Sequence, residues 1–421
     1  MTRGKFILLI TTICLILGFG IYYFYSKYTT TNVTPGTSNT TKDFSLYDQL
    51  FPPKTPTDTA PDTTTGGTTP PENKTLSTRL HQISYKPIAG YGLFTKGIER
   101  LVSDVTIKGK RQTTTDLVPV VRYVDQKTGI IYEQDETHIE NRISNTTIPN
   151  TYEALFSSDG THIIYRFLDK DQQTILTYIG KMINDGSNKP VDLTGNFIYQ
   201  NIKDIKISED GLSYFILKPK SVGVDLVKNA FDSKNETVLF SSPLSEWNID
   251  LEKNSLNLTT KPSGYVTGYS YNIDNTSGSY SKTLSGPGLT EKTSNDSLYK
   301  IYSVFTDRSI HLFISYNKTG IKYDTGLQTL SEKCVYNTNI YYCAVPKNTT
   351  AGTYPDEWYQ GSVSFNDGLW LIDTKNQKQT FIEELKSNTG GIDATNLQIS
   401  KDGKTLYFID KKTSLLWAYD L

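Results

Sequence analysis

The chain has 421 residues, of which 36% are hydrophobic and 21% are charged, and its formal net charge is −1. A net charge this close to zero argues against a nucleic-acid-binding surface. The 29 Tyr residues against 2 Met, with abundant Thr, Asn and Ser, favour strands and turns over a helical enzyme.

An uncharged apolar run at residues 6–25, FILLITTICLILGFGIYYFY, predicts a transmembrane helix. Arg3 and Lys5 precede the run and only Lys27 follows closely, which places the N-terminus in the cytoplasm and the rest of the chain outside. A cleaved signal peptide is the alternative, but bulky aromatic residues follow the run instead of a small-residue cleavage site. We therefore predict a single-pass anchor in the cell membrane over residues 1–28, with an extracytoplasmic C-terminal domain.

Residues 29–78 are rich in Thr and contain two Pro-Pro pairs, and they carry too few apolar side chains to form a core. We expect a disordered linker with an end-to-end distance on the order of 40 Å. Its one apolar island, FSLYDQLF at residues 44–51, is either a short docking motif or a transient helical turn of the tether.

Residues 79–421 alternate between strands and turns, and three segments share one turn: ALFSSDGTHIIYRF, IKISEDGLSYFILK and LQISKDGKTLYFID. Apolar residues alternate on both sides of each turn, which is typical of a half-buried strand pair. In Ser-x-Asp-Gly, the Ser and Asp side chains can bond to the backbone of the turn, and Gly adopts the positive φ. The turn residues are Asp159, Gly160, Asp210, Gly211, Asp402 and Gly403. An ordinary β-sandwich with similar turns is the alternative.

These segments resemble the TolB-type β-propeller repeat, whose usual turn is Ser-Pro-Asp-Gly followed by a strand. Ser158, Glu209 and Lys401 stand where Pro is usual, so the match is to the pattern of turn and strand. The resemblance implies an all-β propeller and no single activity. Longer stretches, among them RYVDQKTGIIYE and SFNDGLWLID, are similar to membrane-anchored propeller proteins of small-genome candidate-phylum bacteria. This second resemblance implies no function.

Counting the second and third strands of each repeat gives seven four-stranded blades, with six or eight as alternatives. The chain ends after three strands of the last blade, and HQISYKPIAG at 81–90 resembles NRISNTTIPN at 141–150, where a fourth strand should leave the first blade. We expect a strand at 80–84 to complete the last blade and remove a sheet edge. The predicted second and third strands fall at 120–132, 162–181, 213–226, 255–273, 310–323, 340–373 and 405–419.

Cys334 and Cys343 flank VYNTNIYY. A turn at Thr338-Asn339 would place the two cysteines opposite each other across a hairpin, at a separation that a disulfide can span. We predict this disulfide and an oxidising compartment, with two buried thiols as the alternative. The spacing matches no zinc pattern.

The longest connection, PKNTTAGTYPDEWYQGS at 346–362, contains Tyr354, Asp356, Glu357, Trp358 and Tyr359. Long loops on rigid rings commonly carry recognition, and this set of aromatic and acidic residues suits a glycan, a cationic peptide or a protein hot spot. We predict a candidate ligand-binding loop. The alternative is a loop whose Trp packs back over its own blade.

The sequence contains no nucleophile-elbow, zinc-peptidase or phosphate-loop motif, so we predict no catalytic residue, metal or cofactor. The preferred hypothesis is a membrane-anchored extracytoplasmic propeller that binds or scaffolds an envelope protein or glycan, with no nucleic-acid partner. One alternative is a carbohydrate-active enzyme, a lyase or glycosidase, which uses acids at the propeller channel. Another is a structural subunit of a secretion or pilus assembly.

Overall fold

The computed structural model describes residues 77–107, 110–183, 189–233 and 235–421. These residues belong to one unit that spans 73–421. The predicted anchor at 1–28 and all but the end of the predicted linker at 29–78 lie outside the described residues. Within the described part of the chain, no helix has the length and apolar character needed to cross a membrane.

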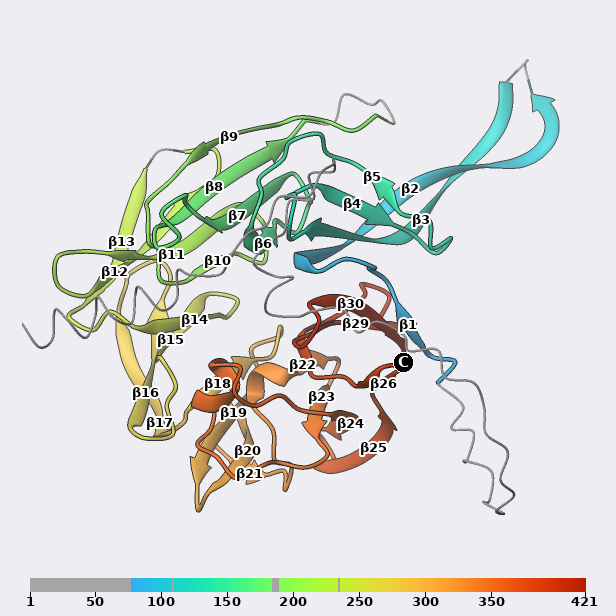
Figure 1. Cartoon of the computed structure of the whole chain (residues 1–421). Coiled ribbons are helices and arrows are strands. Elements are labelled where there is room, and N and C mark those ends of the chain that lie inside the picture. Colours follow the sequence, from blue (N-terminus) through green and yellow to red (C-terminus); the bar gives the residue numbers. More distant parts are fainter. Residues whose placement is uncertain (1–76, 108–109, 184–188, 234) are drawn as a thin grey trace, which may run out of the picture. The chain divides into compact units, whose positions relative to one another are not determined.

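Seven four-stranded antiparallel sheets follow one another around a ring in chain order (Figure 1). Blades 1 to 3 consist of β2 (Ile88–Ile107), β3 (Lys110–Asp125), β4 (Ile131–Gln134) and β5 (Asn141–Arg142); β6 (Thr151–Phe156), β7 (His162–Leu168), β8 (Ile175–Met182) and β9 (Leu193–Phe197); and β10 (Ile205–Ile207), β11 (Ser213–Pro219), β12 (Val224–Ala230) and β13 (Glu236–Ser242). The β2–β3 hairpin is much longer than its neighbours and projects beyond blade 1 (Figure 1).

The remaining strands form blades 4 to 7 and one small hairpin. They are β14 (Trp247–Leu251), β15 (Ser255–Thr260), β16 (Thr267–Asp274) and β17 (Tyr280–Pro287); β18 (Thr290–Thr293), β19 (Tyr299–Thr306), β20 (Ser309–Tyr316) and β21 (Lys322–Asp324); β22 (Cys334–Asn337), β23 (Ile340–Pro346), β24 (Asp367–Asp373) and β25 (Lys378–Glu384); and β28 (Ala394–Ile399), β29 (Thr405–Asp410), β30 (Leu415–Asp420) and β1 (Leu80–Gln82). The hairpin is β26 (Lys386–Ser387) and β27 (Gly390–Gly391). There are also two short helices: η1 (Ser331–Lys333) directly precedes β22, and α3 (Asp356–Tyr359) lies between β23 and β24.

The predicted seven-bladed all-β propeller is therefore confirmed, and six of the seven predicted strand pairs are the second and third strands of a blade. The pair predicted at 310–323 is wrong, because it covers the third and fourth strands of blade 5. The second strand, β19, begins at Tyr299 after the turn Ser294-Asn295-Asp296-Ser297. That turn lacks the Gly which marks the other copies.

The Ser-x-Asp-Gly turns join the first and second strands of blades 2, 3 and 7. In each of them the Ser hydroxyl donates to the Asp carboxylate, at 2.5 to 2.6 Å, and accepts the backbone N–H of the residue five positions later. The glycines have φ between +70° and +75°. Blade 5 repeats the same bonds around Ser294 and Asp296, with Ser297 at a φ of +56° in place of Gly.

The ends of the domain meet in blade 7, as the sequence predicts. β1 pairs antiparallel with β30, so that Leu80 lies opposite Tyr419 and Gln82 lies opposite Trp417. Ile83 N donates to the carbonyl of Leu416 at 2.9 Å, which extends the pairing beyond the strand. The N-terminal strand thus becomes the outermost strand of the last blade, and β30 is not left as an edge.

The predicted hairpin disulfide is also present. Cys334 and Cys343 lie opposite each other in the β22–β23 pair and are bonded, with a Cα–Cα distance of 4.1 Å. Thr338 and Asn339 form the turn with positive φ at both positions, the geometry of a tight two-residue hairpin.

Buried apolar side chains fill most of the interfaces between neighbouring blades. Blade 7 meets blade 1 through Leu416 and Val121, for example. Blades 4 and 5 meet through a buried polar network, in which Lys300 Nζ lies 3.1 Å from the Glu291 carboxylate and donates to Asn257 Oδ1 at 2.9 Å. The ring is therefore held by hydrophobic burial at most blade contacts and by a buried polar network between blades 4 and 5.

We predict that His81→Pro destabilises the ring. The alternation of the antiparallel ladder directs the His81 N–H at Ala418, and Pro removes that donor. The free energy of unfolding should fall by about 1–3 kcal/mol in urea titrations. Tyr85→Ser, at a side chain that is 79% exposed just after β1, should leave it within about 0.5 kcal/mol. Equal stability of both variants would show that β1 does not close the ring.

Candidate functional site

The first strand of each blade lies innermost, where first strands of neighbouring blades contact one another. A cavity of about 370 Å³ lies among the first strands of blades 3, 4, 5 and 7 and the short helices η1 and α3 of blade 6, and it is the candidate functional site. Seven ionisable residues line it, and four of them, from four consecutive blades, are called the channel cluster here: Lys206, Asp250, Lys292 and Glu332.

Strand alternation explains why charged residues reach this cavity. In β14, Trp247 and Ile249 are 5% and 3% exposed and belong to the core between blades 3 and 4. The alternate residues Asn248 and Asp250 line the cavity, and Ile249 contributes to its wall between them. The short η1 helix has a similar effect at blade 6, because Glu332 lines the cavity while its neighbour Lys333 is fully buried behind it.

Each member of the channel cluster has only part of its bonding capacity satisfied by protein. Lys292 Nζ donates to the carbonyl of Cys334 at 2.9 Å, and Lys206 Nζ lies 3.3 Å from a carboxylate oxygen of Asp204. Asp250 Oδ2 accepts the N–H of Thr293 at 2.8 Å, and Glu332 Oε1 accepts the hydroxyl of Tyr359 at 2.6 Å. Within the described residues, no direct ion pair joins a lysine of the cluster to an acid of the cluster.

The cavity shifts the protonation of these groups. Burial raises the pKa of Asp250 to about 7 and also raises the pKa of Glu332. Burial lowers the pKa of Lys292, whereas the charge of Asp204 raises the pKa of Lys206. Several perturbed titratable groups around one cavity mark it as a functional-site candidate.

The predicted binding loop is packed into the protein. Tyr354 and Trp358 are 2% and 3% exposed and belong to an apolar cluster with Phe365. Trp358 Nε1 donates to Asp393 Oδ2 at 2.9 Å, and Asp393 lies directly before the first strand of blade 7. The Trp is therefore buried beside the next blade and does not fold back over its own blade alone. Neither aromatic ring is displayed to a ligand at the surface.

The other three predicted loop residues have separate roles. Asp356 Oδ2 accepts the N–H of Gly264 and ties the loop to blade 4, at 2.7 Å. Glu357 Oε1 accepts the N–H of Thr353 within the loop, at 3.1 Å. Tyr359 is the one member of the predicted set that lines the channel cavity.

A buried ion cluster anchors the loop next to the cavity. Lys333 Nζ lies 2.8 Å from Asp367 and 2.5 Å from Asp393, and it donates to the carbonyl of Ala394 at 2.9 Å. The ring of Trp358 covers the ammonium group at 5.2 Å. Since the lysine and both acidic side chains are inaccessible to solvent, the cluster fixes the loop and the contact between blades 6 and 7.

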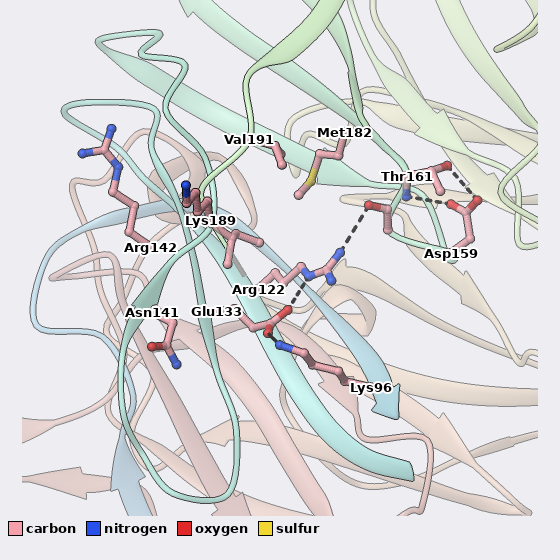
Figure 2. Close-up of a pocket in the computed structure, with 12 residues that line it drawn as sticks. Lys96, Arg122, Glu133, Asn141, Arg142, Asp159, Thr161, Met182, Lys189 and Val191 are labelled. Atoms are coloured by element: carbon pink, nitrogen blue, oxygen red, sulfur yellow. Dashed lines mark hydrogen bonds and ion pairs between the residues drawn. The ribbon is translucent and has the colours of Figure 1, made fainter. Parts of the chain in front are cut away.

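A second cavity, of about 610 Å³, lies between blades 1 and 2 and is rich in charged residues (Figure 2). Lys96 and Arg122 converge on Glu133, each at 2.8 Å, and Arg122 also donates to the carbonyl of Gly160 at 3.3 Å. Burial alone would raise the pKa of Glu133, but the two cations lower it. Both ion pairs lie within blade 1, and the Arg122 bond to the Gly160 carbonyl links blade 1 to blade 2, so these contacts indicate a structural role.

A third cavity, of about 1030 Å³, is a groove between the outer parts of blades 2 and 3. We call it the aromatic groove. His162 and Phe231 stack at 4.4 Å in it, and Phe197 is 62% exposed at its rim. Tyr199 donates to Glu236 at 2.6 Å on the opposite side. Among the described residues, no group of His, Cys, Asp and Glu has the arrangement of a metal site.

Sequence patterns did not single out the channel cluster. Each member lies in a first strand or directly before one, where the alternation of buried and cavity-lining residues could have identified it once the blades were aligned. The aromatic groove has no such signal, because its residues come from strands of two blades and from the connections between them.

No protein-family model matches the sequence, and no curated protein matches it. Among solved structures, TolB from Acinetobacter baumannii is 9% identical with a TM-score of 0.41, over 78% of this chain and 80% of that one. The β-propeller domain of the trilobed protease from Pyrococcus furiosus is 11% identical with a TM-score of 0.46, over 72% and 89%. The match to tricorn protease, 11% identical with a TM-score of 0.41, covers 75% of this chain but 41% of the protease. These similarities concern the propeller fold.

We predict that Lys333→Met destabilises the domain by about 3–5 kcal/mol, because it leaves two buried carboxylates without their cation. Urea unfolding followed by tryptophan fluorescence would measure the change. Lys347→Met is the matched control, since Lys347 is 60% exposed and pairs with Glu384 at the surface. The control should change stability by less than about 1 kcal/mol, and a similar loss in both variants would contradict the structural role of the cluster.

We also predict a pH-dependent effect of Asp250→Asn. The pKa of Asp250 is raised from 3.8 to about 7 in the folded protein, so its contribution to stability is complete below pH 3.8 and is lost as the pH rises through 7. The stability of the natural protein relative to the variant should therefore fall by about 1–3 kcal/mol between about pH 5 and pH 8. Asp225→Asn is the control, because salt-bridged Asp225 has a lowered pKa and stays ionised over this range. A constant difference for Asp250→Asn would contradict the burial of this carboxyl.

Proposed function

We propose that the protein is a membrane-anchored propeller that binds or scaffolds an envelope protein or glycan on the extracytoplasmic side of the membrane. The observation that carries the proposal is the channel cluster: four blades present ionisable groups to one cavity, and each group is only partly bonded to protein. Sites that bind ligands commonly have this form, a concave cavity with a few convergent polar groups.

The proposed location rests on separate observations. The apolar run at 6–25 with its flanking charges supports a single-pass anchor with the N-terminus in the cytoplasm. The Cys334–Cys343 disulfide supports an oxidising compartment for the propeller. Protease added to spheroplasts should then digest the propeller without detergent, and protection of the domain would contradict this orientation.

Crosslinking in intact cells followed by purification of the whole chain tests the binding role. We expect a reproducible protein or glycan partner, and weaker recovery with the double variant Lys292→Gln, Glu332→Gln. The surface double variant Lys347→Gln, Glu384→Gln is the matched control and should recover the partner normally. A stable assembly of several proteins would assign the scaffold role, including a subunit of a secretion or pilus assembly. Recovery of nothing by the natural chain would contradict the proposal.

One observation favours an enzyme as the second candidate. Asp250 and Glu332 both face the cavity, and both have raised pKa values. A carboxyl that stays protonated near neutral pH can act as a general acid, and a second carboxylate completes the pair that glycan cleavage requires. Release of reducing ends from envelope glycans that is lost in Asp250→Asn and in Glu332→Gln would support a carbohydrate-active enzyme over a binding module.

A further inference from the structure

The unused bonding capacity of the channel cluster is of two kinds. Each lysine ammonium has three donors, and the structure gives Lys206 and Lys292 one protein acceptor apiece. Asp250 and Glu332 each use one carboxylate oxygen, which leaves the other oxygen for the cavity. The cavity therefore offers donors and anionic acceptors at the same time.

The charge of the cluster restricts the class of ligand. When ionised, its two lysines and two acids sum to zero, so a multiply charged anion would meet the two acids and a polyamine would meet the two lysines. Two other acids line the cavity, and both are ion-paired: Glu291 with Lys300, and Asp204 with Lys206, at 3.3 Å. Among the described residues, Lys292 is therefore the lysine of the cluster without an acidic partner, and Lys206 offers its remaining N–H donors. A ligand with one positive and one negative group matches the cluster without a repelled charge.

The size of the cavity agrees with a small ligand. Its 370 Å³ is about twelve times the volume share of one water molecule in the liquid, which suits an amino acid or a short peptide. Tyr359, Asn248 and Asn396 also line the cavity and could contact the uncharged part of such a molecule.

We propose that the channel cluster binds a small zwitterion that has a free amine and a free carboxylate, namely an amino acid or a short peptide. The amine lies between Asp250 and Glu332, and the carboxylate meets Lys206 and Lys292. This inference rests on the proposed function, in which the propeller is a binding module.

Binding should depend on pH through Asp250. Protonated Asp250 cannot pair with an amine, so affinity should fall about tenfold for each pH unit below 7. The charged and titratable groups that act on Asp250 or are affected by it are Glu291, Lys292, Lys300, Lys206 and Tyr341. The positive charges of Lys292 and Lys300 lower the pKa of Asp250, but burial raises it by more. The pKa of Asp250 therefore stays raised, and the expected direction of the pH dependence is unchanged.

Calorimetric titration of the whole chain in detergent with L-alanyl-L-alanine tests the proposal. We expect binding at about pH 8, a loss of at least about tenfold when the amine is acetylated, and a similar loss when the carboxylate is amidated. Alanine and tetra-alanine, titrated in parallel, distinguish a free amino acid from the end of a longer chain. Equal affinity for dialanine and its acetylated or amidated forms, or binding of none of them, would overturn the inference. This titration uses the natural protein and needs no variant.

Variants then locate the site. Lys292→Gln and Glu332→Gln should each weaken dialanine binding at least about tenfold, and Asp250→Asn should reduce its pH dependence. Lys347→Gln and Glu384→Gln should bind normally, and far-ultraviolet circular dichroism verifies that each variant is folded. Normal binding by folded channel variants would overturn the assignment. A partner captured from cells without dialanine binding would refute the zwitterion and keep the binding module. Dialanine binding without any captured partner would support the zwitterion and contradict the envelope protein or glycan as the partner.

Discussion

The pairing of β1 with β30 is the constraint on which the rest of the structure depends. It joins residues that are more than three hundred positions apart and converts a row of seven sheets into a ring. The channel cluster takes its members from four consecutive blades, so its geometry depends on how those blades are placed in the ring.

A recurrent contact links the blades next to that site. An aspartate of one blade accepts the backbone N–H of the first strand of the next blade: Asp204 with Ile249, Asp250 with Thr293, and Asp367 with Ala394, all at 2.7 to 2.8 Å. These bonds satisfy inner-strand amides, but they hold carboxylates in poorly hydrated positions, where burial raises the pKa of Asp250 to about 7 and that of Asp367 to about 6. The acids that hold neighbouring blades together include one that faces the cavity. Asp250 therefore has a structural role in addition to the binding role that we propose for it.

The parts of the fold that sequence predicted correctly are those with a local pattern. The Asp-Gly turns, the alternation of strands and the spacing of Cys334 and Cys343 identified seven blades, the closing strand and the disulfide. Prediction failed at β19, because Ser297 adopts the positive φ that was expected to require Gly. It also missed the channel cluster, since membership depends on which strand is innermost and on the register between blades.

The loop at 346–362 shows why composition alone could not assign a binding surface. The sequence around a Trp beside acidic residues is the same whether the Trp is exposed or buried. Here Trp358 is buried because it donates to Asp393 and its ring covers Lys333, and both residues are distant from it in sequence. The same packing connects the loop to the cavity. Tyr359, the neighbour of Trp358, donates to Glu332, the neighbour of Lys333. Since the two contacts are adjacent along both segments, movement of the loop would change the hydrogen bonding of Glu332, and the loop thereby acts on the cavity through one hydroxyl group.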